Sequence, residues 1–355
     1  LVLWGGAQFY PNSFLTPVAA LPVSMAEATP TPWPTFTSTP TLTPTPYYWP
    51  VEAGTPAPTP SGALQADAQR LGCLHHDETP VLAVTVADGE IRALHAELTR
   101  HYRYSTLQPS THVTHPLTFT TFALAEAGTE IAVARERNLY IYAFPSWERA
   151  LRSRVSTFSR IQTLTYAVGQ QQLILGLENG YLWVVNPATG AIVWLLNAGD
   201  NPVTALAAHP EQPLALSGNA DGVVRLWDMA NGAQIAAFEG HGAAVRFLAF
   251  APHTERAISV DADGQWIVWD VAQRTLLRQR TPTLTGALSV LLWTENGIVG
   301  GTTAGDLLFV DENLSIDRVP VSGAAITSMT VDASGAALIG FDTGEICLWG
   351  VLDLP

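Results

Sequence analysis

Two groups of side chains in the sequence have types and spacing that could do chemistry. Residues 75–78 (HHDE) are consecutive imidazoles and carboxylates, which are common metal ligands. Asp261 and Asp263 flank a predicted turn and could act as a general acid and base. Neighbouring residues on a strand or loop point apart, however, so residues 75–78 are more simply an ordinary polar loop, between the first two strands of the first repeat described below.

Other catalytic arrangements cannot be assigned. The sequence contains no recognisable Ser/His/Asp or Cys/His constellation, Gly-rich phosphate loop or HExxH motif. Its two cysteines form no Cys-x-x-Cys pair, which argues against a thiolate zinc site, a c-type haem attachment and a thioredoxin-like motif. We therefore expect a protein that is not an enzyme and that holds no cofactor or metal.

Composition limits the remaining classes of function. The chain has 355 residues, of which 47% are apolar and 14% charged, as expected of a folded protein with a substantial core. Its net charge of −14 argues against nucleic-acid binding, which needs a basic surface. No apolar run reaches the roughly 18 residues of a membrane-spanning helix.

The elements that position these side chains belong to a repeat. A turn glycine followed by an alternating apolar strand recurs at intervals of 39 to 49 residues, with an asparagine in one slot: Gly89, Asn138, Gly180, Gly222, Gly264, Gly305 and Gly344. Glycine supplies the positive φ of a tight hairpin, and asparagine tolerates it. Each unit contains four short strands, which predicts an all-β fold, a seven-bladed β-propeller of four-stranded antiparallel blades.

The last unit ends after its third strand, so a strand from the N-terminal side must close the ring. Residues 47–64 are the expected source, with residues 47–51 the most strand-prone part. We place the propeller at residues 65–355. Cys73 is then expected in the first strand of the first blade, and Cys347 in the third strand of the last. A disulfide between them would lock the closure, whereas two buried thiols are the alternative.

The repeats resemble those of the WD-repeat propeller family. Trp227-Asp228 and Trp269-Asp270 match the family's Trp-Asp pair, and Gly240-His241 matches its Gly-His pair. The resemblance implies a buried structural network in the fifth blade, made by His241, Ser259, Asp263 and Trp269. In the fourth blade it implies Ser217, Asp221 and Trp227, with Gly199-Asp200 at the Gly-His position. The other blades have lost most of this pattern.

Residues 1–64 form a separate segment. Residues 1–62 hold 13 of the 25 prolines, which favours an extended, Pro/Thr-rich tether. Aromatic residues interrupt it, and we expect some of them to anchor the segment on a partner protein: Trp33, Tyr47, Tyr48 and Trp49. Incidental decoration of a flexible stalk is the alternative.

Arginines gather in the second blade, whereas residues 161–355 carry seven arginines against nineteen acidic residues. Arg149, Arg152 and Arg154 could dock an acidic protein surface or lipid headgroups; the alternative is a solvated outer strand.

Together these features predict a non-catalytic protein–protein interaction module. Thr-Pro tethers are commoner outside the cytoplasm. We therefore expect an extracytoplasmic accessory or scaffold subunit of a membrane-associated bacterial assembly, such as an electron-transport complex, held there by partners or an upstream anchor. The alternative is a propeller enzyme or ligand-binding protein with a site at the central channel.

Overall fold

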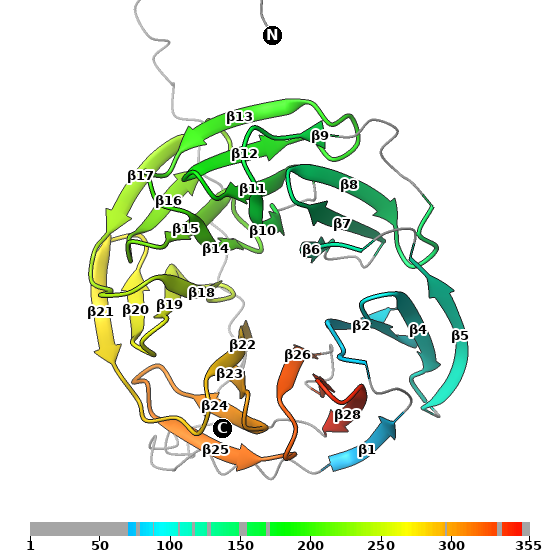
Figure 1. Cartoon of the computed structure of the whole chain (residues 1–355). Coiled ribbons are helices and arrows are strands. Elements are labelled where there is room, and N and C mark those ends of the chain that lie inside the picture. Colours follow the sequence, from blue (N-terminus) through cyan, green and yellow to red (C-terminus); the bar gives the residue numbers. More distant parts are fainter. Residues whose placement is uncertain are drawn as a thin grey trace, which may run out of the picture. The chain divides into compact units, whose positions relative to one another are not determined.

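The computed structural model describes residues 70–349 except 76–78, 88, 106, 116–117, 126–128, 149–154, 168–170, 295–296 and 332–335. These residues form a ring of seven four-stranded antiparallel sheets, as the repeat predicts (Figure 1). The described part contains no helix that is long and apolar enough to span a membrane.

Each blade is a meander that runs from an inner strand at the central channel to an outer strand at the rim (Figure 1). Blade 1 contains β2 (Ala83–Ala87), β3 (Glu90–Leu94), β4 (Leu98–Arg103) and β5 (Gln108–Thr114). Blade 2 contains β6 (Thr121–Leu124), β7 (Glu130–Arg135), β8 (Asn138–Ala143) and β9 (Val155–Ser156). Blade 3 contains β10 (Ile161–Tyr166), β11 (Leu173–Leu177), β12 (Tyr181–Val185) and β13 (Ile192–Asn197).

The remaining blades follow the same order. Blade 4 contains β14 (Val203–Ala208), β15 (Leu214–Asn219), β16 (Val224–Asp228) and β17 (Ala233–Phe238). Blade 5 contains β18 (Val245–Phe250), β19 (Arg256–Asp261), β20 (Trp266–Asp270) and β21 (Thr275–Arg280). Blade 6 contains β22 (Leu288–Thr294), β23 (Gly297–Thr302), β24 (Asp306–Val310) and β25 (Ile316–Pro320). Blade 7 contains β26 (Ile326–Val331), β27 (Ala337–Phe341), β28 (Glu345–Trp349) and β1 (Arg70–His75).

The strand that closes the ring is β1, so the prediction that residues 47–64 supply it is wrong. β1 pairs antiparallel with β28 as the outer strand of blade 7. Cys73 therefore lies in the last blade, and not in the first strand of blade 1, which is β2. Residues 70–75 contain no proline, so each of their backbone amides can act as a donor.

Six of the seven predicted turn residues adopt positive φ: Gly89, Gly180, Gly222, Gly264, Gly305 and Gly344. At Gly180 a Cβ atom would lie 2.0 Å from the carbonyl oxygen of Gly199, so only glycine fits between this turn and the next loop. Asn138 differs from the prediction. It is the first residue of β8, and Glu136 takes the positive φ of 55° in that blade.

Neighbouring blades pack through apolar clusters. Seven clusters of buried side chains occur among the described residues, one at each junction between successive blades. The ring is therefore held by contacts that each blade makes with two neighbours, and it has a continuous core once it is closed.

Four junctions share a further packing detail. The second strands of blades 3, 4, 6 and 7 each carry a glycine, and a residue at or just before the start of the next blade's inner strand packs against it. A Cβ on Gly218, for example, would lie 2.5 Å from a methyl carbon of Val245. The other pairs are Gly176 with Val203, Gly301 with Ile326, and Gly340 with Val81. All four of these aliphatic residues are fully buried, so the glycines allow close approach of the blades.

Candidate functional site

The buried polar network of blade 5 joins two strands, β19 and β20, and the loop before β18. The Trp269 indole Nε1–H donates to Ser259 Oγ at 2.7 Å, and Ser259 Oγ lies 2.6 Å from His241 Nε2. His241 Nδ1 lies 3.2 Å from Asp261 Oδ2. If the Ser259 hydroxyl donates to His241 Nε2, then His241 Nδ1–H donates to the Asp261 carboxylate. Each of these side-chain groups then has a hydrogen-bond partner.

This arrangement requires a neutral imidazole. Burial lowers the pKa of His241 below its ordinary value, despite the opposing effect of Asp261. The carboxylate also accepts from the backbone N–H groups of Asp263 and Gln265 at 3.0 and 2.9 Å. Asp261 is thus a structural acceptor that holds the β19–β20 turn.

The carboxylate that meets His241 in the network is that of Asp261. The prediction that Asp263 supplies this carboxylate is therefore wrong. Asp263 lies two residues further along, in the turn itself, where its side chain is exposed. Only Asp261 ends β19, next to Ser259, and so reaches His241. One carboxylate of the pair is therefore buried in the network, and the other is exposed to solvent.

Blade 4 repeats part of the network. Trp227 Nε1–H donates to Ser217 Oγ at 2.9 Å. Asp221, however, lies at the exposed turn, where it accepts from Asn201 at 3.3 Å. Its predicted place is taken by Asn219, which is fully buried and donates to the carbonyls of Ala198 and Asn201, at 2.9 Å each.

A second relay of the same kind joins blades 1 and 2, and the sequence pattern did not reveal it. Trp147 Nε1–H donates to Thr99 Oγ1 at 3.0 Å, and that oxygen lies 3.1 Å from His115 Nε2. The imidazole stacks on the indole with 3.9 Å between ring centroids. Burial lowers the pKa of His115 to about 4, so this histidine is also neutral. Its members are 16 and 32 residues apart along the chain, outside any repeat motif.

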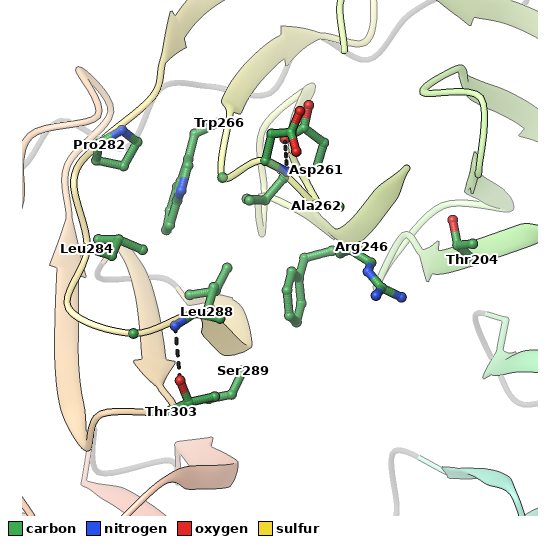
Figure 2. Close-up of a pocket in the computed structure, with 16 residues that line it drawn as sticks. Thr204, Arg246, Asp261, Ala262, Trp266, Pro282, Leu284, Leu288, Ser289 and Thr303 are labelled. Atoms are coloured by element: carbon green, nitrogen blue, oxygen red, sulfur yellow. Dashed lines mark hydrogen bonds between the residues drawn. The ribbon is translucent and has the colours of Figure 1, made fainter. Parts of the chain in front are cut away.

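A cavity of about 610 Å³ lies over the junction of blades 5 and 6 (Figure 2). Its lining comes from the inner strands of blades 4, 5 and 6, from β19 and β20 of blade 5 and from the loops beside them, which places it toward one end of the central channel. Phe247, Trp266, Leu284 and Leu288 make its apolar wall, and Arg246 is its one lining cation. In Figure 2, Arg246 extends toward Thr204, and Trp266 and Leu284 lie on the other side.

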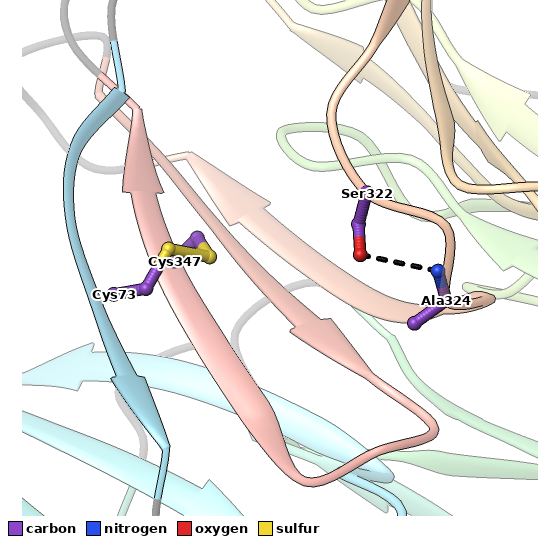
Figure 3. Close-up of a disulfide and its surroundings, with 4 residues drawn as sticks. All are labelled: Cys73, Ser322, Ala324 and Cys347. Atoms are coloured by element: carbon purple, nitrogen blue, oxygen red, sulfur yellow. Dashed lines mark hydrogen bonds between the residues drawn. A yellow bond between two sulfur atoms is a disulfide. The ribbon is translucent and has the colours of Figure 1, made fainter.

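The closing strand is bonded to its neighbour. Cys73 and Cys347 face each other in the β1–β28 register and form a disulfide (Figure 3). With Glu345 they are the only described group of three side chains whose potential metal ligands converge, within 4.8 Å. Because the two sulfurs are bonded to each other, they offer no thiolates to a metal.

Several predicted residues lie outside the described part of the chain. They are the aromatic anchors Trp33, Tyr47, Tyr48 and Trp49, the arginines Arg149, Arg152 and Arg154, and residues 76–78 of the HHDE run. His75 ends β1, opposite Glu345, so this run follows the closing strand and does not join two strands of blade 1.

The ring defines the class of fold, a seven-bladed β-propeller. Residues 191–228 and 232–270 match the family model described as WD domain, G-beta repeat. These two matches end at the Trp-Asp pairs of blades 4 and 5, where the polar network is best preserved.

Among solved structures, the chain is similar to the computationally designed protein Ika8. The two share 16% sequence identity with a TM-score of 0.65, over 80% of this chain and 100% of the other. No curated protein matches the sequence significantly. The likeness to Ika8 concerns the fold alone. WD40 propellers are typically non-catalytic and generally bind other proteins, and this fold is consistent with an interaction module.

Proposed function

We propose that this protein is a non-catalytic protein–protein interaction module, an extracytoplasmic accessory subunit of a larger membrane-associated bacterial assembly. The observation that carries the proposal is the closed WD-repeat ring, whose seven blades pack on both neighbours. Such a ring is a rigid support for loops at its two ends, and loops on a rigid scaffold commonly carry binding residues.

The extracytoplasmic location is supported by the cross-link at the ring closure. The disulfide between Cys73 and Cys347 joins the two ends of the propeller, which are 274 residues apart. Disulfides persist in oxidising compartments and are rare in the cytosol of most organisms. In this proposal the aromatic residues of segment 1–64 and the arginines at 149, 152 and 154 are further contacts with partner subunits.

The test is to extract the native protein in mild detergent and to identify co-migrating proteins by mass spectrometry. We expect membrane subunits in stoichiometric amounts, and their identity would also show whether the assembly is an electron-transport complex. A protein that migrates alone after gentle extraction would overturn the proposal.

The second candidate function, a ligand-binding protein or enzyme with a site at the central channel, is favoured by the cavity between blades 5 and 6. It predicts a small molecule bound to the purified protein, detectable by mass spectrometry of a denatured sample. The interaction module predicts no bound small molecule.

A further inference from the structure

The cavity between blades 5 and 6 lies where the chain departs twice from its own repeat. The first departure is in the middle strand. In blades 3, 4, 6 and 7 the residue directly after the inner-strand bulge lies opposite a glycine, for example Ala205 opposite Gly218. Blade 5 has Val260 there, opposite Phe247. The Val260 side chain occupies the space that the glycines leave for the next blade.

The inner strand of blade 6 is packed differently beside Val260. The residue that packs on the glycine is fully buried in each case: Val203, Val245 and Ile326 begin their inner strands, and Val81 lies two residues before β2. In blade 6 the corresponding residue is Leu288, which is only partly buried and lines the cavity. The cavity therefore results from an added side chain at Val260 that holds Leu288 away from the junction.

The second departure is at the bulge of the inner strand. In blades 4, 6 and 7 the bulged residue is Thr204, Ser289 or Thr327, and its hydroxyl donates to the carbonyl of the adjacent glycine at 2.9–3.1 Å. Blade 5 has Arg246 instead. Its side chain is exposed, and no described residue makes a hydrogen bond or ion pair with it. A bridging hydroxyl is thus replaced by an unpaired cation at the channel.

The apolar wall carries a third feature. The indole of Trp266 is fully buried at the cavity, and its Nε1–H has no hydrogen-bond acceptor in the described structure. Buried indole N–H groups normally have a partner. One cavity thus combines an unpaired guanidinium, an unsatisfied indole donor and the apolar side chains of Phe247, Leu284 and Leu288.

We propose that this cavity binds a segment of a partner protein that presents an acidic side chain next to a bulky apolar one. The planar guanidinium of Arg246 matches a carboxylate, which can accept two parallel hydrogen bonds. The acidic residues Asp261 and Asp263 also line the cavity, and they disfavour a dianionic phosphate more than a single carboxylate. The volume of about 610 Å³ accommodates two or three side chains.

This proposal rests on the proposed function, because it names the chemistry by which the module would recognise a partner. The probe is a pair of blocked hexapeptides, Gly-Ser-Leu-Glu-Ser-Gly and the same peptide with glutamine for glutamate, titrated into the purified full chain and followed by amide NMR. We expect the glutamate peptide to shift the amide signals of Gly264, Gly286 and Ala287 in a saturable way. The glutamine peptide should bind at least about tenfold more weakly.

Two variants and a control identify the site. Arg246→Thr, which installs the residue of blades 4 and 7, should weaken the glutamate peptide at least about tenfold. Ala262→Phe, which fills the cavity from an exposed loop position, should abolish its shifts. Arg278→Gln removes an exposed arginine from the outer strand of the same blade and should change nothing.

Equal binding of the two peptides, or unchanged binding by both cavity variants, would overturn the assignment. The co-migration experiment separates this failure from failure of the proposed function. Partner subunits that still co-migrate with the Arg246→Thr protein would leave the module standing and remove this cavity as its contact. Peptide binding by a protein that migrates alone would leave the cavity standing and remove the accessory role.

Discussion

Two aspartates at the β19–β20 turn have opposite surroundings although they are only two residues apart. Asp261 is buried and accepts from His241 and from two backbone amides, whereas Asp263 is exposed. Removing a buried acceptor leaves its donors unsatisfied. Asp261→Ala should therefore lower the free energy of unfolding by about 2–4 kcal/mol.

The matched control is Asp263→Ala, which should change that free energy by less than about 0.5 kcal/mol. Urea denaturation of both variants provides the comparison, with the midpoint and the slope fitted together. Equal losses, or a larger loss at position 263, would contradict the network described for blade 5.

His115 makes stability depend on pH at the junction of blades 1 and 2. Burial lowers its pKa to about 4, whereas an exposed histidine in the unfolded chain titrates near its ordinary value of about 6.5. Between these two values the unfolded chain binds a proton that the folded protein does not. Stability from this group is therefore complete above pH 6.5 and is lost as the pH falls toward 4.

The measurement is the urea midpoint of unfolding from pH 7 to pH 4, for the wild type and for His115→Phe. Phenylalanine can still stack on Trp147 but cannot titrate, so the decline over this range should be shallower in the variant. If stability declined equally in the two proteins, the pKa of His115 would not be lowered in the folded state.

At the residue scale, the network residues that a repeat motif names, such as Trp269 and Ser259, were predictable. Contacts that form only when distant segments meet in the folded ring were not. A motif gives the spacing of residues along one pair of strands. It does not show whether Asp261 or Asp263 points into the buried network. The Trp147–Thr99–His115 relay spans two blades and has no fixed spacing. Arg246 and Val260 become conspicuous only when the strand registers align all blades.

At the scale of elements, the glycines of the middle strands set how closely blades approach. A Cβ on Gly218 would lie 2.5 Å from Val245, which is fully buried in the next blade. Gly218→Ala should therefore destabilise the protein by about 1–3 kcal/mol through overpacking. Gly242 has no atom within 4 Å of an added Cβ and no positive φ.

Gly242→Ala is thus the control and should leave the stability within about 0.5 kcal/mol. Thermal unfolding of the two variants is sufficient to compare them. If Gly218→Ala left the stability unchanged, glycine would not be needed for the close approach of the blades. The origin of the cavity beside Val260 would then lose its explanation.

Turns and blades were predictable because glycine at a regular period has a local physical cause, the positive φ of a hairpin. The closing strand was not. β1 pairs with β28 across a separation of 274 residues, which leaves no local signal of partnership. Its sequence, RLGCLH, is equally suitable for an inner or an outer strand.

At the scale of the whole molecule, the disulfide converts an open chain of blades into a covalently closed ring. Reduction leaves β1 held by strand pairing and by the packing of its apolar side chains. The double variant Cys73→Ser, Cys347→Ser should therefore lose about 2–5 kcal/mol of stability relative to the oxidised protein. A reducing agent should lower the wild type to the level of the variant and leave the variant unchanged.

Denaturant unfolding with and without the reducing agent makes this comparison. Two free thiols, detected by alkylation of the unreduced, denatured native protein, would contradict the cross-link directly. They would also remove the main support for an extracytoplasmic location.

The central claim is that the ring works by holding a partner. Its most direct test is the mass of the native particle, measured by native mass spectrometry after gentle extraction. The account predicts a stable particle heavier than the 38.0 kDa chain by at least one different subunit in fixed stoichiometry. A single species at 38.0 kDa, with no other protein bound, would contradict it.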